Sequence, residues 1–217
     1  MIELRNISKS YRTLDGRRRT VLNDVNLAIP PNRSVGVLGR NGAGKSVMLR
    51  LISGLELPDR GQVLTHNRRV SWPLGTPAGV HGSLTGAENV RFVCKLYNKN
   101  YEEVLAFVES FAELKDYLKM PVKTYSAGMK SRLGFGISMA IEFDTYLIDE
   151  GFAAGDATFR KRAQEMFKAR RDRANLVVVS HNPTTIANLC DTVAILRSGQ
   201  IQIFEDVAEA IKIYQAL

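Results

Sequence analysis

The chain has 217 residues and a mass of 24.2 kDa, enough for one substantial core and too little for two full-size domains. Hydrophobic residues make up 45% and charged residues 24%, which excludes a disordered or low-complexity chain, and no apolar run approaches the thickness of a bilayer. The net charge of +8 predicts an anionic partner such as nucleic acid, a lipid surface or a nucleotide, and composition does not choose among them. The basic residues are dispersed, which is more typical of a solvated surface than of a nucleic-acid footprint.

Two features are typical of a protein that stays in the reducing cytosol. Residues 1–5 lack the basic-then-apolar pattern of an export signal, so nothing is expected to direct export. Cys94 and Cys190 are far apart and have no third cysteine beside them. Buried free thiols are therefore favoured over a disulfide or a metal site.

Short β-like runs occur along the chain. They lie at 2–4, 21–29, 35–38, 145–148, 176–179 and 193–196. The runs at 35–38, 145–148 and 176–179 are continuously apolar, which is typical of parallel strands buried on both faces.

Helical patterns separate these strands. From Gly44 to Leu55, apolar residues recur at three- and four-residue spacing. A broad apolar stripe predicts a helix over 102–118, and Ser126 can cap another helix that runs to about residue 140. The alternation predicts an α/β fold with a mainly parallel sheet, and the helical stretch 85–140 predicts a subsidiary lobe.

Residues 39–46 fit the pattern G-x-x-x-x-G-K-[ST] between the strand 35–38 and the helix that begins near Gly44. Glycines let successive backbone N–H groups turn inward as an anion nest, and the helix N-terminus adds partial positive charge. Lys45 can reach the β- and γ-phosphates of a nucleotide, and the Ser46 hydroxyl can coordinate Mg²⁺. The predicted nucleotide-binding residues are Gly39, Arg40, Asn41, Gly42, Ala43, Gly44, Lys45 and Ser46.

Polar residues follow two of the apolar strands, with Asp149 and Glu150 after 145–148 and His181 near the end of the third run. The carboxyl ends of parallel strands meet at the edge where ligands bind. Asp149 is predicted to hold Mg²⁺ through water, and Glu150 to orient or deprotonate the attacking water. His181 is predicted to contact the γ-phosphate, so that with Lys45 these groups position and neutralise a phosphoryl transfer. A solvated strand end is the alternative for the acidic pair, and the preceding phosphate-loop pattern disfavours it. A structural histidine is the alternative for His181, and its place at the end of a third apolar strand disfavours that reading.

The segment 125–130, Tyr-Ser-Ala-Gly-Met-Lys, resembles the Leu-Ser-Gly-Gly-Gln signature of ABC ATPases, and the resemblance covers essentially the whole chain. It implies one domain, 1–217, with a mainly parallel core at about 1–84 and 141–217, an antiparallel N-terminal β part, and a helical subdomain at about 85–140. It also implies a head-to-tail homodimer in which one subunit's signature closes on the ATP of the other. The residues implied to bind nucleotide in this way are Ser126, Ala127, Gly128, the adenine-stacking Tyr11, and Asp156 in a loop that crosses the dimer.

Segments 71–75, 82–90, 123–135 and 213–217 look like those of the ATP-binding subunits of capsular-polysaccharide exporters. This resemblance implies an ATP- and Mg²⁺-dependent hydrolase that lies peripherally on the cytoplasmic face of the bacterial inner membrane. Two copies would drive two permease subunits, which carry the polysaccharide and dock a helix around residues 72–90. Relatives that export O-antigen often have an added carbohydrate-recognition domain, and none is expected here.

Three residues depart from the usual ABC pattern. His81 stands where most members have a glutamine that contacts Mg²⁺ and the membrane partner. Imidazole is a poorer Mg²⁺ ligand than an amide oxygen, which argues against His81 as a metal ligand and leaves its coupling role. In the signature, Met129 replaces glutamine and Ala127 replaces glycine.

Other functions stay open at this stage. Export of O-antigen or teichoic acid is one, and a soluble ABC mechanoenzyme acting on ribosomes or DNA is another. The second fits the charge, but such proteins usually fuse two cassettes or carry long arms, so no nucleic-acid partner is expected. An inactive regulatory subunit is disfavoured by the intact Lys45, Asp149, Glu150 and His181. The arginines 17–19 can also contact anionic lipid headgroups, each contributing about 1 kcal/mol.

Overall fold

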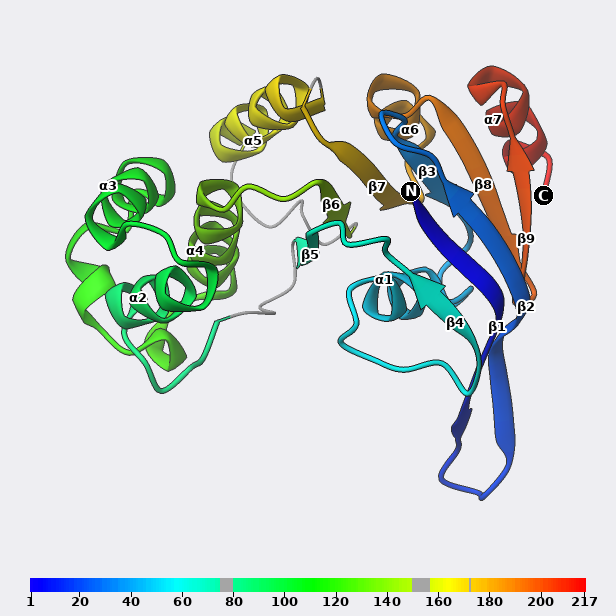
Figure 1. Cartoon of the computed structure of the whole chain (residues 1–217), viewed down its shortest axis with the longest axis horizontal. Coiled ribbons are helices and arrows are strands. Elements are labelled where there is room, and N and C mark those ends of the chain that lie inside the picture. The colour runs from blue at the N-terminus through cyan, green and yellow to red at the C-terminus, as the bar shows by residue number, and fades with distance from the viewer. Residues whose placement is uncertain (75–79, 150–156, 172) are drawn as a thin grey trace. The chain divides into compact units, whose positions relative to one another are not determined.

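The computed structural model describes residues 1–74, 80–149, 157–171 and 173–217 (Figure 1). The chain divides into two units. The first comprises Met1–Pro73, Phe143–Glu150 and Phe167–Leu217, and the second comprises Leu74–Glu142 and Gly151–Met166. The domain boundaries implied by the ABC resemblance stay a prediction.

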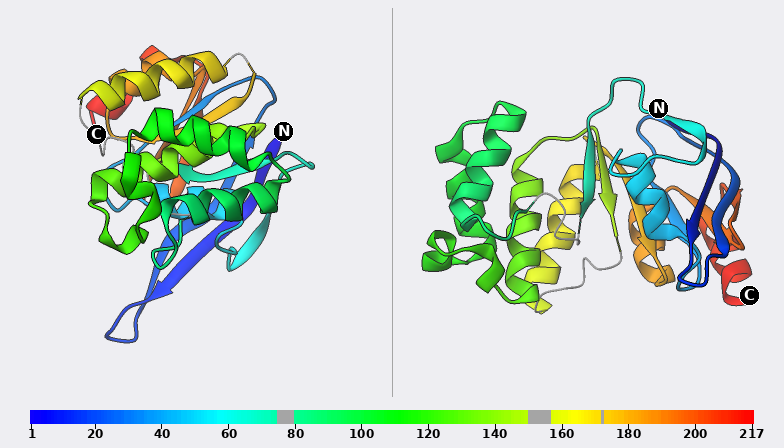
Figure 2. Two further views of the ribbon diagram at one scale, coloured as in Figure 1. Left: turned by 90° about the vertical axis from the view of Figure 1, so that its left-hand side faces the viewer. Right: turned by 90° about the horizontal axis from the view of Figure 1, so that it is seen from below.

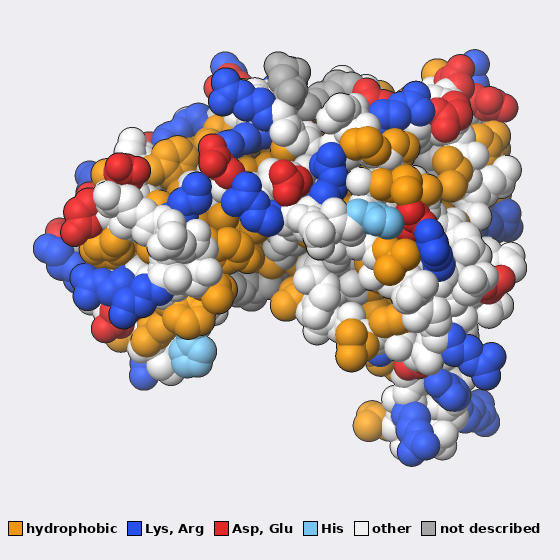
Figure 3. All heavy atoms as spheres, viewed as in Figure 1, with side chains coloured by type: hydrophobic (Ala, Val, Ile, Leu, Met, Phe, Trp, Pro, Cys, Tyr) orange, Lys and Arg blue, Asp and Glu red, His pale blue; other side chains and the backbone are white. Residues whose placement is uncertain are grey.

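An antiparallel sheet of order β2-β1-β4 opens the first unit. Its strands are β1 (Ile2–Arg12), β2 (Arg18–Ile29) and β4 (Arg60–Leu64). The predicted strands at 2–4 and 21–29 are confirmed, but β1 continues to Arg12 because it pairs with the start of β2 as a hairpin. Lys and Arg side chains gather on this hairpin (Figure 3).

The second sheet has the order β5-β6-β7-β3-β8-β9, and its central strands are parallel. Its strands are β3 (Val35–Leu38), β5 (Val70–Leu74), β6 (Thr145–Ile148), β7 (Asn175–Ser180), β8 (Thr192–Arg197) and β9 (Gln200–Phe204). Every residue of β3, β6 and β7 is buried, which is why these strands read as continuous apolar runs. The predicted α/β fold with a mainly parallel sheet is confirmed, and β9 runs antiparallel to its neighbour β8.

Three helices pack on this sheet: α1 (Lys45–Ile52), α6 (Pro183–Leu189) and α7 (Val207–Gln215). Met48 of α1 is fully buried in one hydrophobic cluster with residues of β1, β2 and β3, so α1 fills the space between the two sheets. Gly36 of β3 points to the other face, because side chains alternate along a strand. A Cβ on Gly36 would lie 2.6 Å from Ile186 of α6, so this glycine lets α6 approach the sheet.

The second unit is helical. It contains α2 (Gly86–Tyr97), α3 (Tyr101–Ala112), α4 (Ala127–Ala140), two short 3₁₀ segments and the first part of α5 (Ala157–Arg171). Figure 2 shows α2, α3 and α4, in green, gathered in one bundle. The ring of Phe111 packs 5.2 Å from that of Phe135 and 5.3 Å from that of Phe159, measured between centroids. None of the helices in the described part of the chain is long and apolar enough to cross a membrane.

One predicted helix is wrong at its end, and two other predictions are confirmed. The helix predicted over 102–118 stops at Ala112, because Glu113 takes a left-handed conformation with φ of 54° that cannot continue an α-helix. The Ser126 hydroxyl accepts a hydrogen bond from the Met129 N–H at 3.2 Å and so caps α4 as expected. Both cysteines are free and buried.

Two glycines offer a matched test of close packing in the antiparallel sheet. Gly61 and Gly16 have φ of 81° and 80°. A Cβ on Gly61 would lie 2.2 Å from the Arg5 carbonyl oxygen, whereas one on Gly16 would meet nothing within 4 Å. We expect Gly16→Ala to lower the free energy of unfolding by about 1 kcal/mol and Gly61→Ala by about 3 kcal/mol or more. Urea unfolding measures both, and equal losses would contradict the close approach of β4 to β1.

Candidate functional site

The loop between β3 and α1 has the geometry of an anion nest. Gly42 and Gly44 both adopt positive φ, 79° and 108°, which side chains disfavour. The Ala43 N–H donates to the Arg40 carbonyl at 3.1 Å and the Met48 N–H donates to the Gly44 carbonyl at 2.9 Å. The loop therefore turns tightly onto the N-terminus of α1, where backbone N–H groups and the helix dipole favour an anion.

Lys45 is held inside this loop and is only 7% exposed. Its ammonium group donates to the Gly39 carbonyl at 2.6 Å and to the Arg40 carbonyl at 3.2 Å. Burial lowers the pKa of Lys45 from its ordinary value of 10.5, and the nearby negative charge of Asp149 opposes that shift. The cation is thus already desolvated and aimed along the loop.

The carboxyl ends of three strands meet beside the loop. Leu38 at the end of β3 is in register with Ser180 at the end of β7, and Ile148 of β6 is in register with Val178. The next residues along the chain are Gly39, His181 and Asp149, so the parallel sheet brings these three predicted positions to one edge. Asp149 is buried and His181 is exposed.

A cavity of about 540 Å³ contains most of the predicted nucleotide-binding residues of the first unit. It is lined by Tyr11, Arg19, Val21, Asn41, Gly42, Gly44, Lys45, Ser46, Val47 and Asp149. The Ser46 hydroxyl and the Asp149 carboxylate are oxygen donors of the kind that Mg²⁺ prefers, and Mg²⁺ normally completes its shell with water and phosphate oxygens. No group of three or more His, Cys, Asp or Glu side chains suited to a metal occurs among the described residues. The described residues therefore do not form a metal site built from protein ligands alone.

Tyr11 at the mouth of this cavity is anchored by its hydroxyl. The hydroxyl donates to the Glu56 carboxylate at 2.6 Å and accepts from Arg50 at 3.3 Å. Burial and the Glu56 contact raise the pKa of Tyr11. The side chain is 36% exposed, so its ring is fixed in place and partly open to a ligand, as base stacking requires.

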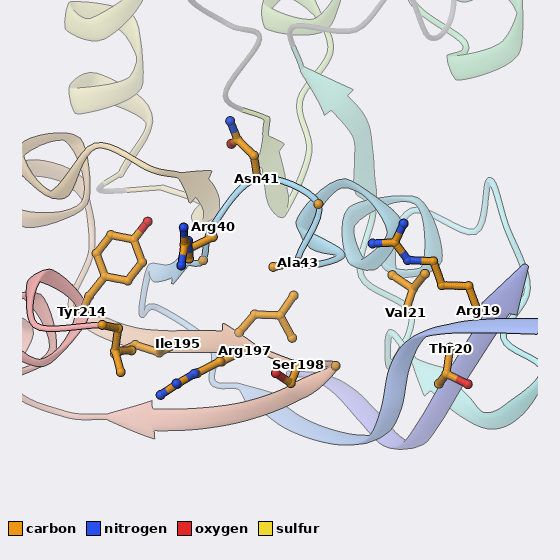
Figure 4. A pocket seen from close by; sticks show the side chains of 15 residues that line it. Arg19, Thr20, Val21, Arg40, Asn41, Ala43, Ile195, Arg197, Ser198 and Tyr214 are labelled. Atoms are coloured by element: carbon orange, nitrogen blue, oxygen red, sulfur yellow. The ribbon is translucent and has the colours of Figure 1, made fainter.

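A second cavity of about 400 Å³ lies on the other flank of the loop (Figure 4). It extends from β2 across the loop to the end of β8 and to α7, and no aspartate or glutamate is among the described residues that line it. Three arginines line it instead, namely Arg19, Arg40 and Arg197. The two cavities share Arg19, so the positive potential around the loop extends to both of its sides.

In the second unit, two of the predicted signature residues line a cavity of about 450 Å³. Ser126 and Gly128 lie there at the N-terminus of α4, together with Arg132 and Glu113. The Glu113 carboxylate lies 3.9 Å from Arg132 and 2.5 Å from Arg162 of α5, so it links the signature helix to α5. Ala127 is exposed at the start of the same helix.

His81, also in the second unit, is presented on a tightly bonded turn. The buried Asn89 side chain accepts from the His81 N–H at 2.7 Å and donates to the carbonyls of His81 and Thr85. Thr85 and Glu88 form a capping box at the start of α2. The turn is therefore rigid while the His81 imidazole itself is exposed.

Some predicted residues cannot be placed, and one group was not predicted. Glu150 and Asp156 lie outside the described residues. Arg19 at the loop and the Glu113–Arg132–Arg162 network beside the signature were missed as site residues, since no local motif marks them. The arginines 17–19 form a visible run in the sequence. Only the strand register shows that Arg19, and not Arg18, is paired with Tyr11.

The fold and the glycine loop define a P-loop protein, and comparisons with known proteins identify the family. The model of the family described as "ABC transporter" matches residues 22–153. The polysialic acid transport ATP-binding protein KpsT of Escherichia coli is 47% identical, over 100% of this chain and 99% of that protein. The capsule polysaccharide export ATP-binding protein CtrD of Neisseria meningitidis is 44% identical over all of both chains. The chain therefore belongs to the ABC transporter family.

More distant likenesses agree with this assignment. Relatives named for the export of teichoic acids or O-antigen are between 30% and 36% identical. Among solved structures, the dimeric ATP-binding cassette MJ0796 bound to ADP and Pi superimposes with a TM-score of 0.80 at 22% identity, covering 94% of this chain and 98% of that one. At this identity the likeness supports the fold alone, and it confirms the predicted ABC ATPase fold.

Lys45 allows a test through the pH dependence of binding. We expect Lys45→Ala to weaken ATP binding about a hundredfold, because it removes a charged hydrogen-bond donor from the loop. A lowered pKa means that the ammonium group loses its proton below the ordinary 10.5, so its attraction for phosphate is present at neutral pH and lost as the pH rises. Calorimetric titrations should therefore show wild-type affinity falling as the pH approaches that value, with a flatter profile for Lys45→Ala. Parallel profiles would exclude Lys45 as the titrating group.

Proposed function

We propose that this protein is the ATP-binding and hydrolysing subunit of an ABC exporter, and that it powers export of capsular polysaccharide across the inner membrane through a separate permease. The observation that carries the proposal is one cavity that holds the nested loop together with Lys45, Ser46 and Asp149. The names of the relatives at 44% and 47% identity, which specify capsule polysaccharide and polysialic acid, support the substrate class. The lower identity of the teichoic-acid and O-antigen relatives makes those glycans the second choice.

The residues of the first unit divide the work of phosphoryl transfer among themselves. The loop N–H groups and Lys45 bind the phosphates, and Ser46 and Asp149 would hold Mg²⁺, directly and through water. Bound Mg²⁺ would neutralise charge on the phosphates. Glu150 would orient or deprotonate the attacking water, and His181 at the end of β7 would steady it near the γ-phosphate. Tyr11 would stack on the adenine.

The signature would act in trans. The second unit has a cavity at the N-terminus of α4 with Ser126 and Gly128 in its lining, and we infer that it would act as a second anion site. One chain thus has one phosphate loop and a second helix N-terminus suited to the same ligand. A head-to-tail homodimer pairs them, with Ala127 at the contact and Asp156 in the loop that crosses to the partner. The cassette MJ0796 of similar fold is dimeric, which supports a dimeric state here.

Two copies would bind two permease subunits at the cytoplasmic face of the inner membrane, and the permease would carry the polysaccharide. The docking region predicted at 72–90 contains His81, whose exposed side chain stands on the turn held by Asn89. An exposed imidazole on a rigid turn suits contact with a partner helix better than metal binding. We therefore assign His81 to coupling and Mg²⁺ to the first unit's cavity.

His81 yields a prediction that separates coupling from metal binding. His81→Ala should lower recovery of the permease about fivefold or more, because interface anchors typically contribute at least 1 kcal/mol. ATP affinity and its Mg²⁺ dependence should stay unchanged in the isolated subunit. His66→Ala, at another exposed histidine, is the matched control. A shifted Mg²⁺ dependence in His81→Ala would instead make this residue a metal ligand.

The proposed function as a whole is tested by trapping the assembled complex. Glu150→Gln should slow hydrolysis at least about a hundredfold and hold the nucleotide-bound dimer, since the water-activating carboxylate is removed. Purified from detergent-solubilised membranes with ATP and Mg²⁺, the variant should bring with it a multi-span membrane protein, identified by mass spectrometry. Lys45→Ala, which cannot trap nucleotide, serves as the control. Recovery bound to ribosomes or DNA would overturn the exporter proposal and leave only the ATPase.

A further inference from the structure

The tip of the β1–β2 hairpin places two arginine-bearing residue pairs side by side. Tyr11 of β1 is paired with Arg19 of β2, and the next pair along the hairpin joins Arg12 to Arg18. Side chains of directly paired residues share a face of the sheet, and adjacent pairs point to opposite faces. Arg19 is therefore the cross-strand neighbour of Tyr11, while Arg12 lies on the opposite face.

The other cations near Tyr11 are each paired with a carboxylate of the protein. The ammonium group of Lys9 lies 3.0 Å from the Glu56 carboxylate, and Arg50 donates to the same carboxylate at 3.0 Å. Arg18 donates to Asp59 at 2.8 Å. Lys9 and Arg50 converge on Glu56, which holds the Tyr11 hydroxyl, and all three cations are thus already engaged within the protein.

Arg19 differs from all of them. Its side chain makes no hydrogen bond or ion pair within the part of the chain that the structure describes. It lines the cavity that also contains Lys45, Ser46 and Asp149, and it lines the second cavity on the other flank of the loop. In Figure 4 its guanidinium extends from β2 toward the phosphate loop, far from Tyr214 at the opposite end of that cavity.

The neighbouring residue Val21 shows how near this part of β2 comes to the loop. A Cβ on Gly44 would lie 2.8 Å from a Val21 methyl group, so β2 is in van der Waals contact with the last glycine of the loop. Arg19 is two residues away, about 7 Å along a strand. The long guanidinium side chain bridges such a distance and pairs well with phosphate oxygens through its forked donors.

We propose that Arg19 is a further nucleotide-binding residue, whose guanidinium binds the phosphate chain of ATP between the stacked base on Tyr11 and the loop. This inference rests on the proposed function. Phosphate is the ligand because the guanidinium is a cation whose forked donors match phosphate oxygens, and because Arg19 shares its cavity with the loop and with Lys45. Arg19 adds a positive charge from the antiparallel sheet to this cavity. The other cation among the described residues that line it is Lys45 of α1.

The test compares the affinities of ATP, ADP and AMP for the full-length protein by calorimetry at fixed salt. Arg19→Ser should weaken ATP binding about three- to tenfold, ADP binding less, and AMP binding least, because the lost attraction scales with phosphate charge. Arg12→Ser is the matched control, since it removes an exposed arginine of the same hairpin from the opposite face. It should bind all three nucleotides like the wild type, and Arg19→Lys should recover part of the ATP affinity.

The outcomes separate the inference from the proposed function. If the wild-type protein binds ATP and Lys45→Ala weakens that binding about a hundredfold, the role of the phosphate loop is supported, whatever Arg19 does. Within that result, wild-type affinity in Arg19→Ser, an equal loss for the three nucleotides, or the same loss in Arg12→Ser would each overturn the role of Arg19. A wild-type protein that binds no ATP would overturn the proposed function and the inference with it.

Discussion

The contact between Val21 and Gly44 is the constraint on which the site depends. Gly44 has a φ of 108°, and a Cβ there would come within 2.8 Å of a Val21 methyl group and 3.2 Å of its carbonyl oxygen. Only glycine meets both conditions, the left-handed backbone and the close approach. The antiparallel sheet can therefore rest directly on the phosphate loop. That seating places Tyr11 and Arg19 in the same cavity as Lys45.

The far side of β2 is fixed in a related way. The Asn23 N–H donates to the Gly199 carbonyl at 2.8 Å, which ties β2 to the turn between β8 and β9. Gly199 has a φ of 78°, and a Cβ on it would lie 3.0 Å from the Val21 carbonyl. Two glycines far apart in sequence thus allow the same segment of β2 to touch the loop and the parallel sheet. The surfaces proposed to bind the base and the phosphates are thus held together where the backbone of β2 comes close to these two glycines.

The sequence predicted those parts of the fold whose burial is uniform. Strands β3 and β6 are buried at every position, so their apolar runs mark them without ambiguity. The mostly exposed β4 has no such run, and only pairing with β1 makes it a strand. The apolar stripe continues to residue 118, so the sequence predicted a helix of that length. No pattern of hydrophobicity reveals that Glu113 adopts a left-handed conformation, which ends the helix at Ala112. Burial of a strand can be predicted from its local composition, whereas strand pairing and the left-handed end of a helix depend on contacts with the rest of the chain.

The candidate site shows the same division. The loop 39–46 could be predicted because its chemistry is contiguous, and Asp149 because it follows a buried strand. The arginines 17–19 read as one basic run, yet Arg17 pairs with Asp15, Arg18 pairs with Asp59, and Arg19 has no partner within the described residues. The difference arises from strand alternation in the β1–β2 pairing, where Arg18 is paired with Arg12 and Arg19 with Tyr11, a register that local sequence does not disclose. The part of the site that the sequence did not predict, Arg19, therefore lies where β2 meets the phosphate loop, two segments that are separate in the sequence.

The charge at the loop is arranged before any nucleotide arrives. Lys45 is already buried and already donates to the Gly39 and Arg40 carbonyls, so its desolvation is a property of the folded protein and not of binding. A phosphate oxygen has only to replace a carbonyl as the acceptor, which is a smaller change than burying a hydrated ammonium group. Arg19 is the opposite case, since it is exposed and has no partner among the residues that the structure describes, and it must lose water and side-chain freedom on binding. The loop thus provides preorganised attraction for the phosphates, while the hairpin provides an adjustable cation that responds to the charge of the ligand.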